Sequence, residues 1–330
     1  MKCGICACGT GKDYTAREMM FGTGDEFPYF ECSGCGCVQL ASPPPDLARY
    51  YPANYYSFNH AVPGRKTSDR PMNRVRQWCR DRRNEAQILG LGGLWGVVAR
   101  MRPLPGCAGA PSYLRRFPGL RFSSRVMDVG CGDGLLLAQL AGYGFRNLTG
   151  VDPFLPADSR PRPGVRLLAR AIHDVCDGPY DLIMFHHSLE HIPDQQAALG
   201  AARRLLGRSG HCFVRVPVAC SNAWQDYRTH WVELDAPRNF FLHTQESMAR
   251  LAEGVGLRVV SYECDPDDGF NYWGSEMYRR GIPLMDSATG RWTDPKSLFS
   301  EEELAAYRRR AESDCGELRG GRGMFILCPA

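Results

Sequence analysis

Short apolar runs alternate with helical stretches over the C-terminal two thirds of the chain. The runs that predict strands cover residues 125–130, 147–152, 165–169, 180–185, 211–218, 257–264 and 324–329. The stretches that predict helices cover 134–141, 194–206, 245–254 and 301–313. Strands that alternate with helices are typical of a mostly parallel sheet covered by helices. We therefore expect an α/β fold with a seven-stranded, mostly parallel sheet.

The N-terminal part of the chain lacks this alternation. Residues 1–45 contain six cysteines and end at the proline run S-P-P-P, which indicates a domain boundary. Residues 46–118 are rich in Tyr, Arg and Gly and predict helices at 72–87 and 88–101. We expect a small N-terminal module, a helical and aromatic connector, and an α/β domain over 119–330.

Composition narrows the classes of protein. The 40 basic and 36 acidic residues give a net charge of +4, which is too even for a chain-wide nucleic-acid surface. The N-terminus has no charged-then-apolar leader, so we expect reduced thiols and a cytoplasmic location. The most apolar stretch, 88–99, is much shorter than the roughly 20 residues of a membrane-spanning helix.

Three glycines interrupt the chain where the first strand of the α/β part gives way to a helix. The motif D-V-G-C-G-D-G covers 128–134, and side chains at its glycines would block a ligand from the backbone N–H groups. Its G-x-G-x-G spacing differs from the G-x-x-G ending of the dinucleotide fingerprint, which argues against NAD. Asp152 ends the next strand, where an acidic group binds ribose hydroxyls.

This motif, with Asp152 and the sequence Y-D-L-I-M-F-H-H-S-L-E-H-I-P-D at 180–194, resembles the class I S-adenosylmethionine-dependent methyltransferases over roughly residues 120–330. The resemblance implies that the motif holds the methionine part of the cofactor, that Asp152 binds the ribose, and that later residues flank the adenine and close the near side. The resemblance also implies that the α/β fold is a seven-stranded, doubly wound, Rossmann-like sheet whose last strand runs antiparallel. The implied cofactor-binding residues are Asp128, Gly130, Gly132, Gly134, Asp152, Ile172, Asp174, His187 and Leu189.

The N-terminal cysteines form two C-x-x-C pairs, Cys3 with Cys6 and Cys32 with Cys35. Two such pairs bring four thiolates together around Zn²⁺, and metal binding then stabilises a piece too small to have a core of its own. We expect a structural zinc ribbon. Cys8 and Cys37, two residues beyond each pair, remain alternative ligands, and the competing interpretation is a chance group of thiols.

Residues 30–58 resemble the small zinc-binding domain that precedes the catalytic domain in sugar C-methyltransferases and related enzymes. The resemblance implies methyl transfer to O or C of a small molecule, most plausibly a sugar or glycosylated metabolite. It also implies that Tyr55 or Tyr56, with Tyr56 preferred, covers the cofactor. The alternative is that these tyrosines pack the ribbon on the main domain.

Two segments, 219–243 and 265–321, do not fit the alternation, and we expect them to cap the carboxyl edge of the sheet where ligands bind. A hydroxyl or carbon acid requires a base. The candidate bases are His230 first, then His243 and Tyr227. Related enzymes often carry a histidine at the position of Asn239, so that base does not carry over. We interpret the histidines around Glu190 as cofactor-pocket and packing residues rather than metal ligands.

The arginine-rich stretch 70–83 contains Trp78 and precedes an apolar segment. We interpret it as a solvated helix face, and peripheral contact with a membrane and lipid-linked substrates is the alternative.

Two other functions stay open for the protein as a whole. One is an RNA methyltransferase with a zinc module, disfavoured because H-H-S-L-E-H stands where an Asn/Asp-Pro-Pro-Tyr motif is expected. The other is a catalytically inactive cofactor-binding scaffold.

Overall fold

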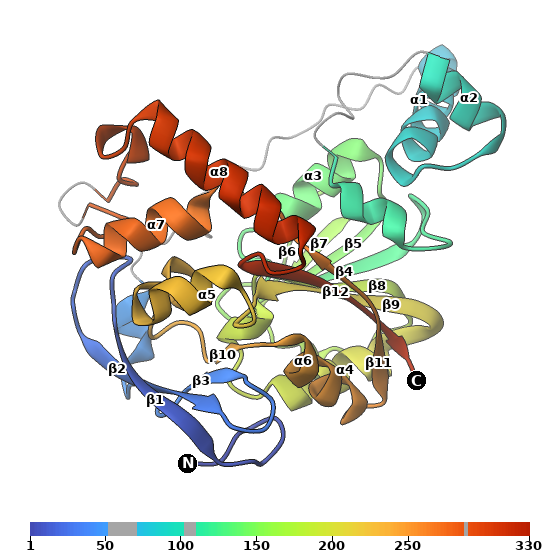
Figure 1. Cartoon of the computed structure of the whole chain (residues 1–330). Coiled ribbons are helices and arrows are strands. Elements are labelled where there is room, and N and C mark those ends of the chain that lie inside the picture. The colour runs from blue at the N-terminus through green and yellow to red at the C-terminus, as the bar shows by residue number, and fades with distance from the viewer. Residues whose placement is uncertain (52–70, 102–109, 287–289) are drawn as a thin grey trace. The chain divides into compact units, whose positions relative to one another are not determined.

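The computed structural model describes residues 1–51, 71–101, 110–286 and 290–330 (Figure 1). The chain folds into two compact units. The first comprises residues 1–55, 185–203 and 213–330, and the second comprises 56–184 and 204–212.

The larger sheet has eight strands in the order β11-β12-β9-β8-β4-β5-β7-β6. They are β4 (Arg125–Val129), β5 (Asn147–Val151), β6 (Ser159–Arg162), β7 (Val165–Leu168), β8 (Tyr180–His186), β9 (Leu206–Pro217), β11 (Leu257–Cys264) and β12 (Arg322–Pro329). β4, β5 and β7 pair in parallel, whereas β12 pairs antiparallel with β11, as predicted for the last strand.

All seven predicted strands are present, and the eighth, β6, was not predicted. β6 pairs antiparallel with β7 at the edge of the sheet, and its sequence S-R-P-R is mostly exposed. Because β6 contains no Val, Ile, Leu or aromatic residue and its third residue is a proline, the apolar pattern gave no sign of it.

Eight α-helices lie in the described part of the chain: α1 (Pro71–Leu89), α2 (Gly93–Met101), α3 (Leu135–Tyr143), α4 (Gln195–Leu205), α5 (Asn222–Tyr227), α6 (Gln245–Glu253), α7 (Phe270–Arg279) and α8 (Glu301–Gly316). Reciprocal capping boxes begin α6, at Thr244 and Ser247, and α8, at Ser300 and Glu303. α5 and α7 were not predicted. The N-cap residue of α7 is Gly269, and because glycine has no side chain, the sequence offers no capping residue to recognise.

The N-terminal module is completed by a strand from far along the chain. β1 (Thr10–Arg17), β2 (Glu26–Cys32), β3 (Val38–Leu40) and β10 (Phe241–Leu242) form a four-stranded sheet in the order β1-β2-β3-β10. β10 pairs antiparallel with β3, with Phe241 opposite Gln39. The module and the segment 219–243 are therefore built together within the first unit.

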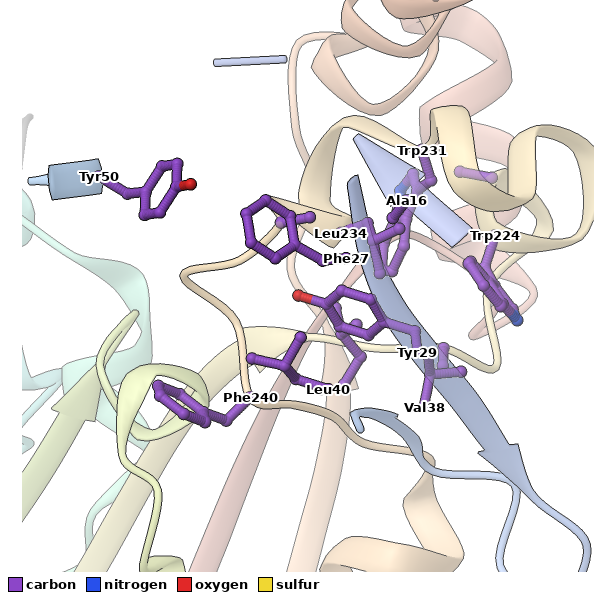
Figure 2. Close-up of a cluster of buried hydrophobic side chains, with 14 of the residues drawn as sticks. Ala16, Phe27, Tyr29, Val38, Leu40, Tyr50, Trp224, Trp231, Leu234 and Phe240 are labelled. Atoms are coloured by element: carbon purple, nitrogen blue, oxygen red, sulfur yellow. The ribbon is translucent and has the colours of Figure 1, made fainter. Parts of the chain in front are cut away.

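Aromatic side chains from both of these segments form one buried core (Figure 2). Tyr29 of β2 donates a hydrogen bond to the Asn239 carbonyl at 2.8 Å. Trp224 packs edge-on against Tyr14, with ring centroids 5.2 Å apart. Trp231 is fully buried, and its Nε1 donates to Asn271 Oδ1 at 2.6 Å. These residues stabilise the fold of this unit.

A fully buried arginine lies beside this core. Arg238 Nη2 pairs with Glu18 Oε1 at 2.9 Å, and its Nε donates to both carboxylate oxygens of Asp235 at 3.0 Å. Its Nη1 donates to the Tyr50 carbonyl at 3.2 Å. The charge is therefore fully partnered, as burial requires.

Cys264, at the end of β11, forms a disulfide with Cys315 of α8. The expectation of reduced thiols is wrong for this pair. The sequence could not show it, because the two cysteines are 51 residues apart and nothing local indicates that their side chains meet.

Among the helices of the described residues, none combines the length and apolar character needed to cross a bilayer. The cytoplasmic location stays a prediction.

Candidate cofactor, metal and acceptor sites

The glycine-rich loop joins β4 to α3 within the second unit. Gly130, Gly132 and Gly134 have φ angles of 72°, 51° and 84°, a region that favours glycine. A Cβ on Gly134 would lie 2.9 Å from Leu167 Cδ2 of β7. Gly134 is therefore required both by the turn and by the packing of the loop on the sheet.

Two carboxylates flank this loop. The Gly132 N–H donates to Asp152 Oδ2 at 3.0 Å, and the Phe154 N–H donates to Oδ1 at 2.9 Å. Asp128 is 3% exposed, and its buried Oδ1 has no hydrogen-bond partner in the described part of the chain. Burial, and then the charge of Asp152, raise the pKa of Asp128 to about 8. A buried acceptor without a partner beside an open backbone loop fits a ligand that brings a cationic donor.

The other predicted cofactor residues are divided between the two units. Ile172 is buried and Asp174 is exposed on the short 3-10 helix η5 (Ile172–Asp174), which follows β7 in the second unit. His187 and Leu189 follow β8 in the first unit, where Leu189 is fully buried and His187 is partly exposed. Tyr56 lies outside the described residues.

The predicted zinc ligands come together in the first unit. The Sγ atoms of Cys3, Cys6, Cys32 and Cys35 all lie within 4.8 Å of one another. Cys3 Sγ is 3.7 Å from Cys35 Sγ, and Cys6 Sγ is 3.4 Å from Cys32 Sγ. Four thiolates around Zn²⁺ at about 2.3 Å would be about 3.8 Å apart. The cluster therefore fits a closed tetrahedral zinc site.

Hydrogen bonds to sulfur support this arrangement. The Ile5 N–H donates to Cys3 Sγ at 3.3 Å, and Gln39 Nε2 donates to the same sulfur at 2.9 Å. The Gly34 N–H donates to Cys32 Sγ at 3.3 Å. The hydrogen bond from the Cys35 thiol lowers the pKa of Cys3 to about 4 despite partial burial. Such donors favour the thiolate that a metal requires.

The two alternative zinc ligands lie outside the cluster. Cys37 is fully buried, and its Sγ lies 3.8 Å from the Val38 carbonyl oxygen. Cys8 packs over Gly34, where an added Cβ would meet Cys8 Sγ at 2.6 Å. The structure therefore favours the four-cysteine set over the substitutions that the spacing left open.

The structure does not bring the three predicted bases together. His243 is fully buried, with Nδ1 2.9 Å from Ser247 Oγ and Nε2 2.7 Å from Gln195 Oε1. Burial lowers the pKa of His243 to about 3. Both ring nitrogens are engaged, so this histidine has the environment of a structural residue.

His230 is exposed on the 3-10 helix η7 (Arg228–His230), which packs beside β1. Tyr227 is partly buried, with Arg279 5.6 Å from its ring centroid, and burial raises its pKa. Within residues 1–51, 71–101, 110–286 and 290–330, no carboxylate hydrogen-bonds to either side chain in a way that would activate it as a base, and the charge of nearby Glu276 helps to raise the pKa of Tyr227. The sequence identified residue types suited to proton transfer, and it could not give their burial.

A different polar group lies at the carboxyl end of β8. Glu190 is buried, and its Oε1 lies 3.6 Å from His187 Nδ1, whereas its Oε2 has no partner among the described residues. Burial raises the pKa of Glu190 to about 8, and burial followed by the charges of Arg322 and Arg215 lowers that of His187 well below its usual range. We had interpreted these residues as pocket and packing residues.

Two arginines line the same edge of the sheet within the first unit. Arg215 of β9 donates to Asp265 Oδ2 at 2.5 Å and lies 2.9 Å from His186 Nε2. Arg322, at the start of β12, pairs with Glu233. His186, Asp265 and Arg322 stand at ends of β8, β11 and β12, and ligands of open α/β sheets bind at this edge. The group can therefore meet an acceptor.

The fold, the glycine-rich loop and its two carboxylates are those expected of a methyltransferase domain of the class I, S-adenosylmethionine-dependent type. Residues 105–262 match the family model for a methyltransferase domain, which confirms the class that the sequence predicted.

Among curated proteins, the chain is similar to the ubiquinone biosynthesis O-methyltransferase of Pectobacterium atrosepticum, with 32% identity over 124 residues, 33% of this chain and 49% of that protein. The enzyme of the same name from Xylella fastidiosa is 38% identical over 101 residues, 28% of this chain and 41% of that protein. The chain thus spans about half the length of the curated relatives it matches.

Among solved structures, a SAM-dependent methyltransferase from Archaeoglobus fulgidus has a TM-score of 0.40 at 18% identity and covers 66% of this chain and 90% of that one. The mitomycin 7-O-methyltransferase MmcR has a TM-score of 0.38 at 12% identity, covering 68% of this chain and 56% of that one.

Proposed function

We propose that this protein transfers the methyl group of S-adenosylmethionine to a hydroxyl oxygen of a small molecule, with a sugar or glycosylated metabolite as the preferred acceptor class. The observation that carries the proposal is the buried, unpartnered carboxylate of Asp128 beside the glycine-rich loop. The match to a methyltransferase domain and the O-methyltransferase relatives support the reaction type.

The cofactor supplies an electrophilic methyl group on a sulfonium. In this proposal Asp128 accepts hydrogen bonds from the cationic amino group of its methionine part, which relieves the unpartnered Oδ1. Asp152, oriented by the Gly132 and Phe154 N–H groups, accepts from the ribose hydroxyls. Ile172 and Asp174 flank the adenine.

For the acceptor, we propose His187 as the base and Glu190 as the residue that orients it. Burial and neighbouring arginines keep His187 neutral, as a base must be before it accepts a proton, but they also make it weakly basic. In this proposal an ionised Glu190, whose Oε1 lies 3.6 Å from Nδ1, offsets that effect while Nε2 accepts the hydroxyl proton. This replaces His230 as the preferred base, because His230 is exposed and the described part of the chain places no carboxylate in hydrogen-bond contact with it. Tyr227 and His243 rank behind both.

We also propose that Cys3, Cys6, Cys32 and Cys35 bind one structural Zn²⁺. Metal binding at these thiols would stabilise the four-stranded sheet, since the Thr244 hydroxyl donates to the Cys35 carbonyl at 2.6 Å immediately after β10. The ion has no proposed role in methyl transfer.

The test is a labelled-methyl transfer assay with purified protein, offered sugars and glycosides, catechol-type hydroxyl compounds and RNA. Small-molecule labelling supports the proposal. Labelling confined to RNA, or none beside tight S-adenosylhomocysteine binding, would favour the RNA methyltransferase or the inactive scaffold. In single-turnover reactions His187→Ala should reduce the rate about 10²- to 10⁴-fold. His230→Ala is the matched control, and a comparable loss there would restore His230 as the base.

A further inference from the structure

We propose that the hairpin formed by α1 and α2 docks on a membrane surface that contains anionic lipid. The first observation is an apolar stripe on α2. Leu94, Val97 and Met101 are 74%, 50% and 78% exposed. Their spacing places them on one face of the helix. Large apolar side chains are usually covered, so a continuous exposed stripe marks a surface that meets another apolar phase.

A tryptophan of α1 extends this surface. Trp78 is 52% exposed, and its ring lies edge-on to that of Trp95 of α2, with centroids 5.7 Å apart. Trp78 also lies under the guanidinium of Arg82, 5.9 Å from its ring centroid. Tryptophan beside a cationic group is typical of the membrane–water interface.

The exposed charges of the hairpin indicate which kind of lipid surface it would bind. Arg76, Arg80, Arg82 and Arg100 are exposed, whereas the two acidic side chains among its described residues are turned inward. One is Asp81, which pairs with Arg146 at 2.8 Å.

The other is Glu85, which is buried and accepts from the Phe122 N–H at 2.8 Å and from Arg82 at 3.0 Å. The exposed charges on the described hairpin side chains are therefore all positive, which complements anionic lipid headgroups. A nine-residue α2 is far too short to cross a bilayer and suits a position in the interface.

The hairpin is also fixed to its own unit. Arg115 donates to the carbonyls of Ile88 and Gln87, at 3.2 and 3.0 Å, and the buried side chains of Ile88 and Leu89 lie at the end of α1. Docking through the opposite, exposed side chains would therefore hold the second unit at the lipid surface. The proposal is independent of the identity of the methyl acceptor.

The test is cosedimentation of the full chain with vesicles of phosphatidylcholine alone or with 30% phosphatidylglycerol, a content of roughly that order being common in anionic bilayers. We expect wild-type binding to the anionic vesicles, weakened by salt. Leu94→Asp/Met101→Asp should lower the apparent partition coefficient at least about tenfold. Trp292→Asp, at an exposed tryptophan elsewhere, is the matched control and should bind as wild type.

Circular dichroism and S-adenosylhomocysteine binding verify that the double variant is folded. If the double variant is not folded, quenching of tryptophan fluorescence by brominated lipid replaces the cosedimentation comparison. In that measurement Trp78→Phe should remove most of the quenching seen with the wild type. The proposal is overturned if the wild type does not cosediment with anionic vesicles, or if a folded double variant binds them as strongly as the wild type. A double variant that changes only self-association, measured by light scattering without lipid, would show a protein interface instead.

Discussion

Replacing Asp128 by Asn should separate stability from cofactor binding. Asp128 is buried with a pKa of about 8, against an ordinary value of 3.8, so the folded protein holds it protonated at neutral pH while the unfolded chain ionises it. A group whose folded pKa is raised contributes its full stability below the unfolded pKa and loses it as the pH rises through the folded value. Asn cannot ionise and removes this loss.

The magnitude follows from the shift. Each pKa unit corresponds to about 1.4 kcal/mol, so the wild type loses about 1.7 kcal/mol at pH 5 and about 4.5 kcal/mol at pH 7 relative to acid conditions. The Asn amide brings a donor that can cost about 1–3 kcal/mol if it is unpartnered, but that cost does not depend on pH. The free energy of unfolding of the variant should therefore gain on the wild type by about 3 kcal/mol between pH 5 and pH 7.

The assay is urea denaturation of both proteins without cofactor at pH 5, 6 and 7, with S-adenosylhomocysteine titrated by calorimetry at pH 7. We expect the affinity of Asp128→Asn to fall about ten- to a hundredfold, the loss of a charge-assisted hydrogen bond. Asp268→Asn, at a carboxylate whose side chain is 93% exposed, is the control and should change neither quantity. A stability difference that is flat with pH, or an unchanged affinity, would refute our account of this site.

Three further predictions concern the metal, the loop and the disulfide. Cys32→Ser/Cys35→Ser should lower the zinc content from about one ion per chain towards none, and undiminished zinc in metal analysis would contradict the four-thiolate site. Gly134→Val should abolish S-adenosylhomocysteine binding in calorimetry, because it places a β-branched residue at a φ of 84° against the sheet, and normal binding would mean that the pocket lies elsewhere. Cys264→Ser/Cys315→Ser should lower the free energy of unfolding by about 4 kcal/mol, from the entropy of the loop it closes. Identical denaturation curves with and without reductant would argue against this disulfide.

The elements that sequence reasoning found share a strong local signal. The parallel strands are nearly continuous apolar runs, and the paired spacing of Cys3 with Cys6 and of Cys32 with Cys35 predicted the four thiols that the fold brings together. β6 was missed because it has no Val, Ile, Leu or aromatic side chain, and α7 because glycine replaces its capping residue.

The proposed acceptor site was harder to predict because burial is a property of the folded chain. His230 and His243 have the same side chain, yet one is exposed and the other is fully buried with both nitrogens engaged. The contact of His187 with Glu190 joins residues three apart along the chain, and its importance comes from the unpartnered Oε2 and the burial around it.

The strand β10 has a consequence for how this protein is made. During synthesis β1, β2 and β3 emerge from the ribosome long before Phe241 and Leu242. About 200 further residues must therefore be made before the last strand of the four-stranded sheet, which carries the cysteine cluster, can pair. The ion pair of the buried Glu18 with Arg238 likewise cannot form until Arg238 has been synthesised. During that interval the open edge of β3 is available to strands of other nascent chains. If the four thiols bind zinc as proposed, early binding would protect the nascent chain, and truncated chains that stop before β10 should aggregate rather than fold as an independent module.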